Sequence, residues 1–296
     1  MSPPVDLGRV GVWSWALSGA PAAVLREVVP ELEELGYPTL WYPEAVAKET
    51  FAAGALLLSF GSRAKVASGI SSIQARDATA MANGARTLAD AFPGRFVLGL
   101  GVSHREPTTA RGHEYGRPLP TMRAYLDAMD AATFLGQEPE QPAPRVLAAL
   151  GPKMLDLARD RADGAHPYFV PVEHTAIARE RLGPDKLLAP EQAVILTDDA
   201  AKARELGREH TSWYLSTENY RNSMLRLGFA EHDIDGGGSD RVRDAVVVSG
   251  DESAIRERVK AHLDAGADHV CIQVLEPNRG LGLEALRRLA PALLDL

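Results

Sequence analysis

The sequence predicts an α/β protein of the TIM (β/α)8 barrel type, and three observations lead to this fold class. The chain has 296 residues, somewhat more than the about 250 that are typical of such a barrel. Short apolar runs alternate with longer segments of helical period, which is the pattern of repeated strand–helix units. The apolar runs are nearly continuous, as in parallel strands covered on both faces. An open doubly wound sheet is compatible with the same pattern.

Eight candidate strands follow one another along the chain. They cover residues 10–15, 39–42, 65–71, 95–102, 146–150, 164–170, 187–196 and 268–275. A ninth candidate, residues 245–249, complicates the count. Helix-to-strand junctions recur at Gly36, Gly164 and Gly266, where a glycine ends the preceding helical segment.

Two segments interrupt this alternation. Residues 104–119 form a long polar loop after the fourth strand, and residues 210–242 combine aromatic and polar side chains with three consecutive glycines, residues 236–238. Both follow a strand or its helix, so they can project onto a functional face. We expect one domain over residues 1–296, with an insertion at about 210–242 that covers the mouth of the barrel.

Composition and missing motifs exclude several classes of protein. A formal charge of −8, from 32 basic and 40 acidic residues, disfavours a general nucleic-acid binder. The single Cys271 rules out an intrachain disulfide and a cysteine-based zinc site. Neither a P-loop, a G-x-S-x-G elbow nor a complete dinucleotide-binding glycine motif is present. No signal peptide is visible, and the longest apolar run, residues 51–60, is about half a membrane span. We expect a cytoplasmic protein without a metal site.

In a barrel, functional groups lie at the carboxyl ends of the strands and in the loops that follow them. This rule selects the following positions: Trp13, Ser14, Glu44, Gly69, Ser71, Ser72, Ser103, His104, Leu150, Gly151, His166, Tyr168, Thr197, Gln273 and Glu276. Most members of such a geometric set serve only the structure.

Two of these positions carry groups suited to proton transfer or ligand binding. His104 directly follows the fourth strand, where an imidazole can exchange a proton near neutral pH, although a loop histidine bonded to backbone is an equally simple interpretation. Glu44 ends the second strand and can accept hydrogen bonds from a cofactor or pair with Arg76. Both are candidate catalytic residues.

Two further features favour binding of a ligand. Gly99 and Gly101 allow a ligand to approach the backbone of the fourth strand closely. Gly151, Pro152 and Lys153 lead from a strand into a helix, whose first N–H groups can hold an anion. An ordinary turn explains the second feature equally well.

Several stretches resemble the luciferase-like monooxygenase superfamily, and especially its branch of oxidoreductases dependent on the deazaflavin coenzyme F420. The stretches are residues 31–45, 65–104, 111–132, 147–170 and 249–275, in the order of the family and over nearly the whole chain. The resemblance over residues 65–132 is the most specific. It implies a TIM barrel that binds F420 at its carboxyl-terminal mouth and transfers a hydride at the deazaflavin C5.

The resemblance also implies a cofactor site. Members of the family often have a cis, non-proline peptide bond after the third strand, which here falls at Gly69–Ile70. The acidic residue that contacts the cofactor corresponds to Glu44. The loop that receives the phosphate tail corresponds to Leu150, Gly151, Pro152 and Lys153, and the turn after the sixth strand to His166, Pro167 and Tyr168. We add the strand-end residues Trp13, Ser71, Gly101 and Ser103 to the expected site.

One position departs from the family. Sugar-phosphate dehydrogenases of this branch carry a catalytic histidine after the acidic residue, but the residue here is Ala45. Their second acid corresponds roughly to His104, to which any acid–base role would move.

Three hypotheses about function follow. The first is an F420-dependent oxidoreductase acting on a carbonyl, an activated alkene or an alcohol of a small molecule. The second is a monooxygenase that uses reduced FMN, and the third is a non-catalytic flavin-binding protein. The resemblance further implies a homodimer formed through helices near the second to fourth strands.

Overall fold

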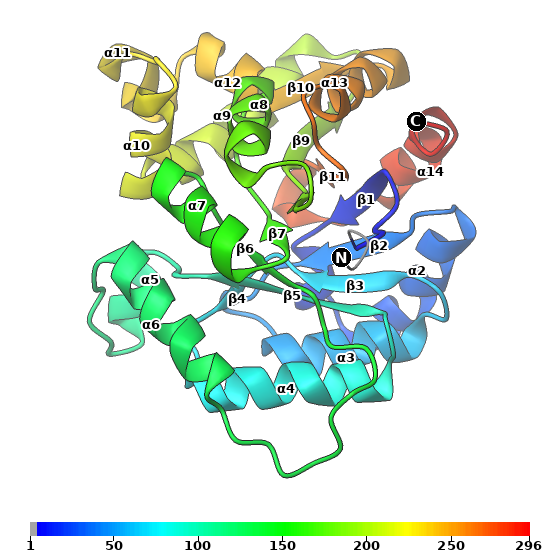
Figure 1. The fold of residues 1–296 in the computed structure, drawn as a ribbon. Coiled ribbons are helices and arrows are strands. Elements are labelled where there is room, and N and C mark those ends of the chain that lie inside the picture. The colour runs from blue at the N-terminus through cyan, green and yellow to red at the C-terminus, as the bar shows by residue number, and fades with distance from the viewer. Residues whose placement is uncertain (1–4) are drawn as a thin grey trace.

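The computed structural model describes residues 5–296, and its strands form a single parallel sheet (Figure 1). Neighbouring strands follow the order β10–β9–β11–β1–β2–β3–β5–β6–β7–β8, with β4 beside β5. Their bounds are β1 Val10–Trp13, β2 Thr39–Tyr42, β3 Lys65–Ser68, β4 Ser71–Ser72, β5 Phe96–Gly101, β6 Arg145–Leu147, β7 Gly164–Ala165, β8 Leu187–Leu188, β9 Glu191–Leu196, β10 Val247–Gly250 and β11 Val270–Val274.

The sheet closes into a barrel through the segment that contains β8 and β9. β8 pairs with β7 on one side, and β9 pairs with β11 on the other. Backbone bonds continue across the break, since Ala189 N–H donates to Ala165 O and Cys271 N–H donates to Pro190 O, both at 3.0 Å. The ring then runs through β11, β1, β2, β3, β5 and β6 back to β7. The predicted barrel is confirmed, and β10, near the ninth candidate strand, pairs only with β9.

Alternate residues of the strands point to two different apolar clusters. In β2, Trp41 belongs to the cluster inside the barrel, whereas Leu40 and Tyr42 pack outward against the helices. In β5, Val97 points inward and Phe96 outward in the same way. Because both faces are buried, polar residues are not needed at every second position, which explains the nearly continuous apolar runs.

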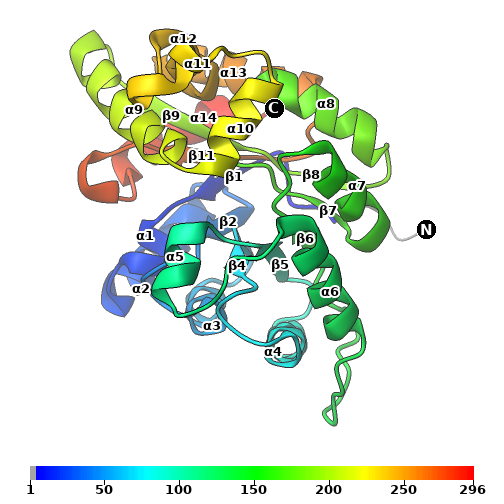
Figure 2. The same cartoon turned by 90° about the vertical axis from the view of Figure 1, so that its left-hand side faces the viewer.

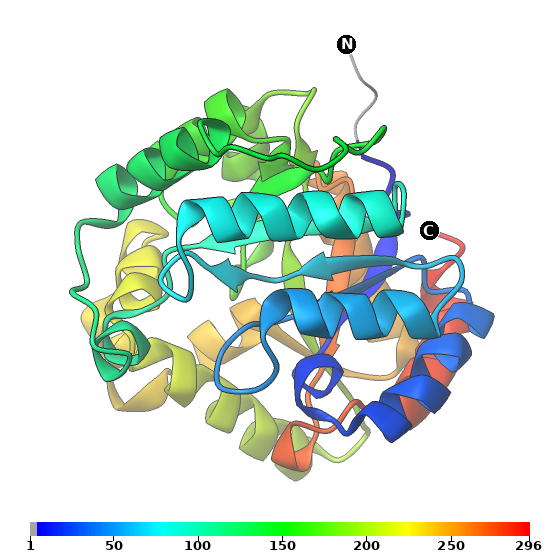
Figure 3. The same cartoon turned by 90° about the horizontal axis from the view of Figure 1, so that it is seen from below.

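Helices cover the outside of the barrel; α3 and α4 lie side by side there (Figure 3). The helices are α1 Ala16–Gly19, α2 Ala22–Glu34, α3 Thr50–Phe60, α4 Ala78–Ala91, α5 Arg105–Ala110, α6 Pro118–Asp130, α7 Pro152–Arg161, α8 Val172–Leu182, α9 Ala200–Leu215, α10 Glu218–Arg226, α11 Glu231–Ile234, α12 Asp240–Val246, α13 Glu252–Asp264 and α14 Leu283–Leu293, with 3-10 turns at η1 Asp235–Gly237 and η2 Pro277–Arg279.

Acidic residues fix the starts of two helices near the mouth. The Glu49 carboxylate accepts the Ala52 N–H at the start of α3, and the Asp77 carboxylate accepts the Ala80 N–H at the start of α4, both at 2.9 Å. These contacts satisfy backbone donors that have no partner within the helix.

Several strands end earlier than the apolar runs predict. The chain leaves the sheet after Trp13 because α1 starts three residues later. The third predicted strand divides into β3 and β4 around Gly69–Ile70. After β7 the chain turns away, and Phe169 adopts a left-handed backbone with φ 57°. The apolar residues beyond these ends are buried at the mouth rather than in the ladder.

The insertion at about residues 210–242 is mostly helical. It contains the end of α9, then α10, α11, η1 and the start of α12. Residues 236–238 all have positive φ, and a Cβ on Gly237 would lie 2.1 Å from Ser212 Oγ. The glycines therefore let η1 pack closely on α9. Figure 2 shows α5 and α10 on the same face, around the carboxyl ends of the strands.

Candidate active site

A cavity of about 580 Å³ lies at the carboxyl ends of the barrel strands, and we call it the large cavity. Its size is in the range of small-molecule and cofactor sites. Its lining includes these residues of the predicted site: Trp13, Glu44, Gly69, Ile70, Ser103, His104, His166 and Tyr168. These residues come from the ends of five different strands, β1, β2, β3, β5 and β7, and meet in one place.

The floor of the large cavity is built on the bulge between β3 and β4. The Gly69–Ile70 peptide bond is cis, as the resemblance implied. The indole Nε1 of Trp13 donates to Gly69 O at 3.1 Å, and the ring of Tyr168 lies 5.0 Å from the indole of Trp13. These contacts join β1, the bulge and the turn after β7 into one surface.

His166 lies beneath this surface with one nitrogen unused. Its ring stacks on Trp41 at 4.4 Å, and Nδ1 donates to Ala189 O at 2.7 Å. Burial lowers the pKa of His166 to about 4, so the ring is neutral and Nε2 is an acceptor. Nε2 is buried, has no partner within residues 5–296, and lies 3.1 Å from where a Cβ on Gly69 would stand. The site therefore offers an unsatisfied acceptor at its floor.

Glu44 lies at the edge of the cavity and is already tied to the protein. Its carboxylate accepts two N–H groups of Arg76, the backbone N–H of Thr50 at 3.1 Å and that of Ser72 at 2.9 Å. The side chains of Glu44 and Arg76 are only 4% and 11% exposed. Of the two roles considered for Glu44, the structure contains the pairing with Arg76. This pair fixes the bulge against the start of α3.

His104 stands on the cavity wall, directly before α5. Its Nδ1 contacts the side-chain oxygen of Asn219 on α10 at 2.9 Å, so Nδ1 carries the proton in the neutral ring. Burial lowers the pKa of His104, although the bond to Asn219 and the Glu106 carboxylate oppose this. The neutral form therefore prevails at neutral pH. In that form Nε2 is an acceptor, which suits it to receive a proton more than to donate one.

The insertion supplies the roof of the large cavity, and its residues were missed by the strand-end rule. These residues are Trp213 and Tyr214 of α9, Ser216 and Thr217 of the turn after it, and Tyr220 of α10. The aromatic content of residues 210–242 was the only sequence signal for them.

Hydroxyl groups form a chain through the wall of this cavity. The Tyr168 hydroxyl lies 2.6 Å from the Tyr214 hydroxyl and donates to the Gln273 side-chain oxygen at 2.6 Å. Burial raises the pKa of Tyr168 and of Tyr214, so both hydroxyls stay protonated. The chain ties the turn after β7 to α9 and β11.

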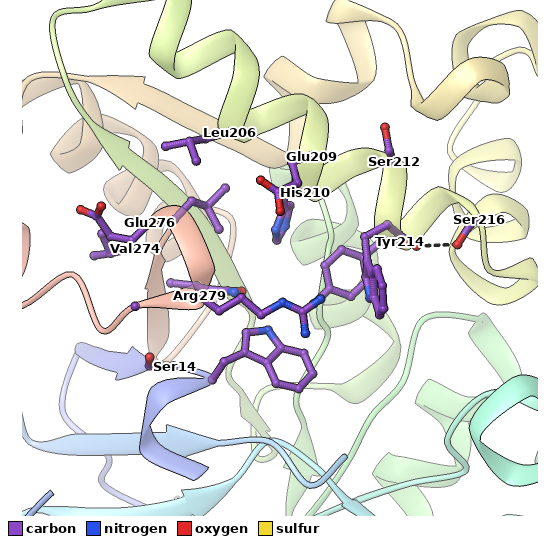
Figure 4. A pocket seen from close by; sticks show the side chains of 15 residues that line it. Ser14, Leu206, Glu209, His210, Ser212, Tyr214, Ser216, Val274, Glu276 and Arg279 are labelled. Carbon is purple, nitrogen blue, oxygen red and sulfur yellow. Dashed lines mark hydrogen bonds between the residues drawn. The ribbon is translucent and has the colours of Figure 1, made fainter. Parts of the chain in front are cut away.

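A second, smaller cavity of about 410 Å³ adjoins the large one (Figure 4). The side chains that line both cavities are Trp15, Trp213, Tyr214, Ser216 and Arg279. Glu209 and His210 of α9 and Glu276 after β11 line the small cavity alone. The small cavity was not anticipated from the sequence, except that Ser14, Gln273 and Glu276 occupy strand-end positions.

Some predicted site residues do not line the large cavity. Ser71 is buried, with its hydroxyl 2.7 Å from that of Thr50. Gly101 is covered by Ile70, whose side chain would lie 2.5 Å from a Cβ at that position. Residues 150–153 belong to the start of α7 instead.

The start of α7 has a cationic neighbour that sequence reasoning missed. Gly151 precedes the helix, and a Cβ there would lie 3.8 Å from a guanidinium nitrogen of Arg226. Arg226 is the last residue of α10, the helix whose Tyr220 lines the large cavity. A helix start and a guanidinium group together suit an anion such as a phosphate.

Glu191 is a buried carboxyl group below the site. One oxygen accepts the Phe169 N–H at 3.2 Å, and the other has no partner within residues 5–296. Burial raises the pKa of Glu191 from 4.5 to about 8, and the bond from Phe169 only partly opposes this. The folded protein thus keeps a proton that the unfolded chain releases above pH 4.5. Stability attributable to Glu191 therefore falls as the pH rises from 4.5 to about 8.

Glu191→Gln is expected to remove this loss of stability, because an amide cannot ionise. The free energy of unfolding of the variant, relative to the parent, should increase with pH across this window, with a limiting slope of about 1.4 kcal/mol per pH unit. Urea denaturation at several pH values measures it. The buried histidines are common to both proteins and cancel in the difference. A difference that is constant with pH would contradict the assignment.

Neither a candidate metal site nor a candidate membrane-spanning helix is found among the described residues. Residues 5–296 contain no group of three or more histidine, cysteine or acidic side chains arranged to hold a metal ion. Within the same residues, no helix is long and apolar enough to cross a membrane.

Comparison with known proteins shows the family to which this barrel belongs. The family model described as luciferase-like monooxygenase matches residues 7–269, so the chain belongs to this family. A Mycobacterium tuberculosis protein that carries the name coenzyme F420-dependent oxidoreductase is 25% identical over 238 residues, 66% of this chain and 67% of its own length. The 5,10-methylenetetrahydromethanopterin reductase of Methanolobus tindarius is 25% identical over 199 residues, 58% of this chain and 61% of its own length.

Solved structures share the fold over nearly the whole chain. An F420-dependent secondary alcohol dehydrogenase, solved with an F420–acetone adduct, has a TM-score of 0.75 at 14% identity and covers 96% of this chain and 98% of its own. The oxygenating constituent of 3,6-diketocamphane monooxygenase from Pseudomonas putida, solved with FMN, has a TM-score of 0.66 at 13% identity and covers 97% and 98%. The chain is thus an enzyme of a family whose members include F420-dependent oxidoreductases.

Proposed function

We propose that the protein is an F420-dependent oxidoreductase that transfers a hydride between the deazaflavin C5 and a small carbonyl, activated alkene or alcohol. The observation that carries the proposal is the large cavity itself, with the Gly69–Ile70 bulge at its floor and the neutral His104 at its wall. The Mycobacterium tuberculosis relative named as F420-dependent supports the choice of cofactor.

The residues present fit a flat heteroaromatic ring with an anionic tail. Trp13, Ile70 and Tyr168 would hold the ring, and the buried Nε2 of His166 would meet a donor near the floor. The start of α7 and Arg226 would hold the phosphate of the tail. When bound, F420 supplies a carbon that accepts or donates a hydride.

The chain's own residues then bind the substrate and move a proton. In the oxidation of an alcohol, His104 Nε2 takes the hydroxyl proton of the substrate, while Asn219 holds the Nδ1–H side of the ring. Trp213, Tyr214 and Tyr220 cover the mouth and exclude water from the reacting carbon. Glu44 is a positioning residue, since its carboxylate is bound to Arg76 and to backbone N–H groups.

Titration of the protein with F420 and with FMN tests the cofactor. Trp13, Trp15 and Trp213 line the cavity, so occupation should quench their fluorescence. We expect F420 to bind more tightly than FMN. Arg226→Met should weaken the binding of F420 by about tenfold. Arg221→Met on the same helix should leave this affinity unchanged, because Arg221 pairs with Glu231 and Asp235.

The alternatives give different outcomes. Tight binding of FMN without a response to F420 would favour the monooxygenase that uses reduced FMN, as the FMN-bound structural neighbour suggests. Binding of either cofactor without hydride exchange on a panel of alcohols and carbonyls would favour a non-catalytic flavin-binding protein. We also propose a homodimer formed by helices next to β2, β3 and β5, which light scattering tests.

A further inference from the structure

Arg279 stands where the large and the small cavity meet, and two indole rings hold its guanidinium group. The guanidinium carbon lies 4.9 Å from the ring centre of Trp15 and 4.7 Å from that of Trp213. Figure 4 shows this side chain between the labelled residues of α9 and the loop after β1. Both distances lie within the range of cation–π contacts, so the two rings hold the charged end of the side chain.

The edge of this guanidinium has no partner among residues 5–296. Within them the Arg279 side chain forms neither an ion pair within 4.0 Å nor a hydrogen bond, and only its backbone N–H donates, to Glu276 O at 3.2 Å. The other guanidinium groups on the cavity side are used, since Arg76 pairs with Glu44 and Arg111 donates to Ala45 O at 2.9 Å. Arg279 is exposed, so the donor edge of its guanidinium is open to solvent and to a ligand.

The backbone of η2 aims Arg279 at the mouth. Asn278 and Arg279 both have left-handed backbones, with φ 58° and 56°. Two consecutive non-glycine residues in this region are uncommon and are found where function requires a particular direction of the side chain.

The charges on the two sides of Arg279 differ. On the small-cavity side, the carboxylates of Glu209 and Glu276 line the wall and repel an anion. On the large-cavity side, Glu44 is neutralised by Arg76, and Arg111 accompanies the exposed Glu106. An anion would therefore meet the guanidinium edge from the large cavity.

We propose that Arg279 binds the carboxylate of a small organic acid and that this acid is the substrate, which the cavity holds with its reacting carbon near His104. As a statement about the substrate, this inference rests on the proposed function. A carboxylate matches the planar donor edge in a bidentate manner, which a neutral amide or ester does not.

Binding of benzoate, with benzamide as its uncharged analogue, tests the site on the protein without cofactor. Ligand-observed NMR titrations give both dissociation constants. We expect benzoate to bind and benzamide to bind at least about tenfold more weakly. Arg279→Met should weaken the binding of benzoate by about tenfold or more. Arg279→Lys should weaken it by less, because lysine keeps the charge but not the planar edge. Arg111→Met is the matched control, because it removes the same charge from the same cavity.

Three outcomes overturn the inference. Equal binding of benzoate and benzamide means that charge is not recognised. Equal losses in Arg279→Met and Arg111→Met mean a general electrostatic effect. A loss of F420 affinity in Arg279→Met with unchanged benzoate binding assigns the residue to the cofactor. Failure of the parent to bind F420, with benzoate still dependent on Arg279, refutes the proposed function but leaves the carboxylate site in place.

Discussion

His104→Ala is expected to lower the turnover number about 10²–10⁴-fold while leaving the dissociation constant of F420 unchanged. This expectation follows from the position and the protonation of the His104 imidazole. It lines the large cavity, it is neutral because burial lowers its pKa, and Nδ1 is occupied by Asn219, so that Nε2 alone is available to the substrate. A group that acts only on the proton of the substrate contributes to the rate and little to cofactor affinity.

Controls for His104 separate its chemistry from its place in the loop. His113→Ala removes an exposed histidine of the same segment and should leave turnover unchanged. Asn219→Leu should shift the pH dependence of the oxidation rate and lower the rate less than His104→Ala does, since it disturbs only the orientation of the ring. In the oxidation direction the rate of the parent should rise with pH, with a midpoint below the ordinary pKa of histidine, 6.5. Loss of F420 binding in His104→Ala would make His104 a cofactor contact.

The sequence predicts the barrel well because strand burial leaves a clear chemical pattern. Parallel strands are covered on both faces, so β2 and β11 are buried throughout and mostly apolar, with Thr39 and Gln273 as their polar members. The strand-end rule then identifies Glu44, His104 and His166 without knowledge of side-chain contacts. The order of these residues along the chain follows from the topology alone.

The roof and the second cavity could not be predicted, because they depend on how helices outside the repeat pack. Tyr214 and Tyr220 come from adjacent helices, and their rings meet at 5.1 Å only once the turn between α9 and α10 is formed. Arg279 lies between Trp15 and Trp213, which are about two hundred residues apart in sequence. The period of a sequence carries no information on such contacts between distant loops.

The position of Glu44 is predicted correctly from the sequence, but its role depends on hydrogen-bond partners that the sequence does not reveal. Its position after β2 follows from the sequence, and Arg76 is a foreseeable partner. The two backbone N–H groups that it accepts, from Thr50 and Ser72, belong to loops whose paths are set by the bulge and by the start of α3. The carboxylate is thus held by four donors, and its contribution is first of all to the shape of the cavity.

Glu44→Gln is expected to lower the free energy of unfolding by about 3–5 kcal/mol. The change removes the charge that compensates the Arg76 guanidinium, whose side chain is only 11% exposed. It also turns an amide NH₂ toward backbone N–H donors that the carboxylate accepted at 2.9 and 3.1 Å. A buried cation left with only the half-exposed Glu49 as its partner and opposed donors both cost more than a neutral pair would. Urea denaturation of parent and variant measures the difference.

A matched control exists on the same guanidinium group. Glu49 also contacts Arg76, at 3.0 Å, but its side chain is 49% exposed. Water screens that pair, so Glu49→Gln should cost no more than about 1 kcal/mol. The double variant Glu44→Gln with Arg76→Met should recover part of the loss, because it removes the uncompensated charge together with its partner. Equal effects of Glu44→Gln and Glu49→Gln would show that the buried pair does not fix the bulge. In that case Glu44 would be free to contact the cofactor directly, as the acidic residue does in the relatives it resembles.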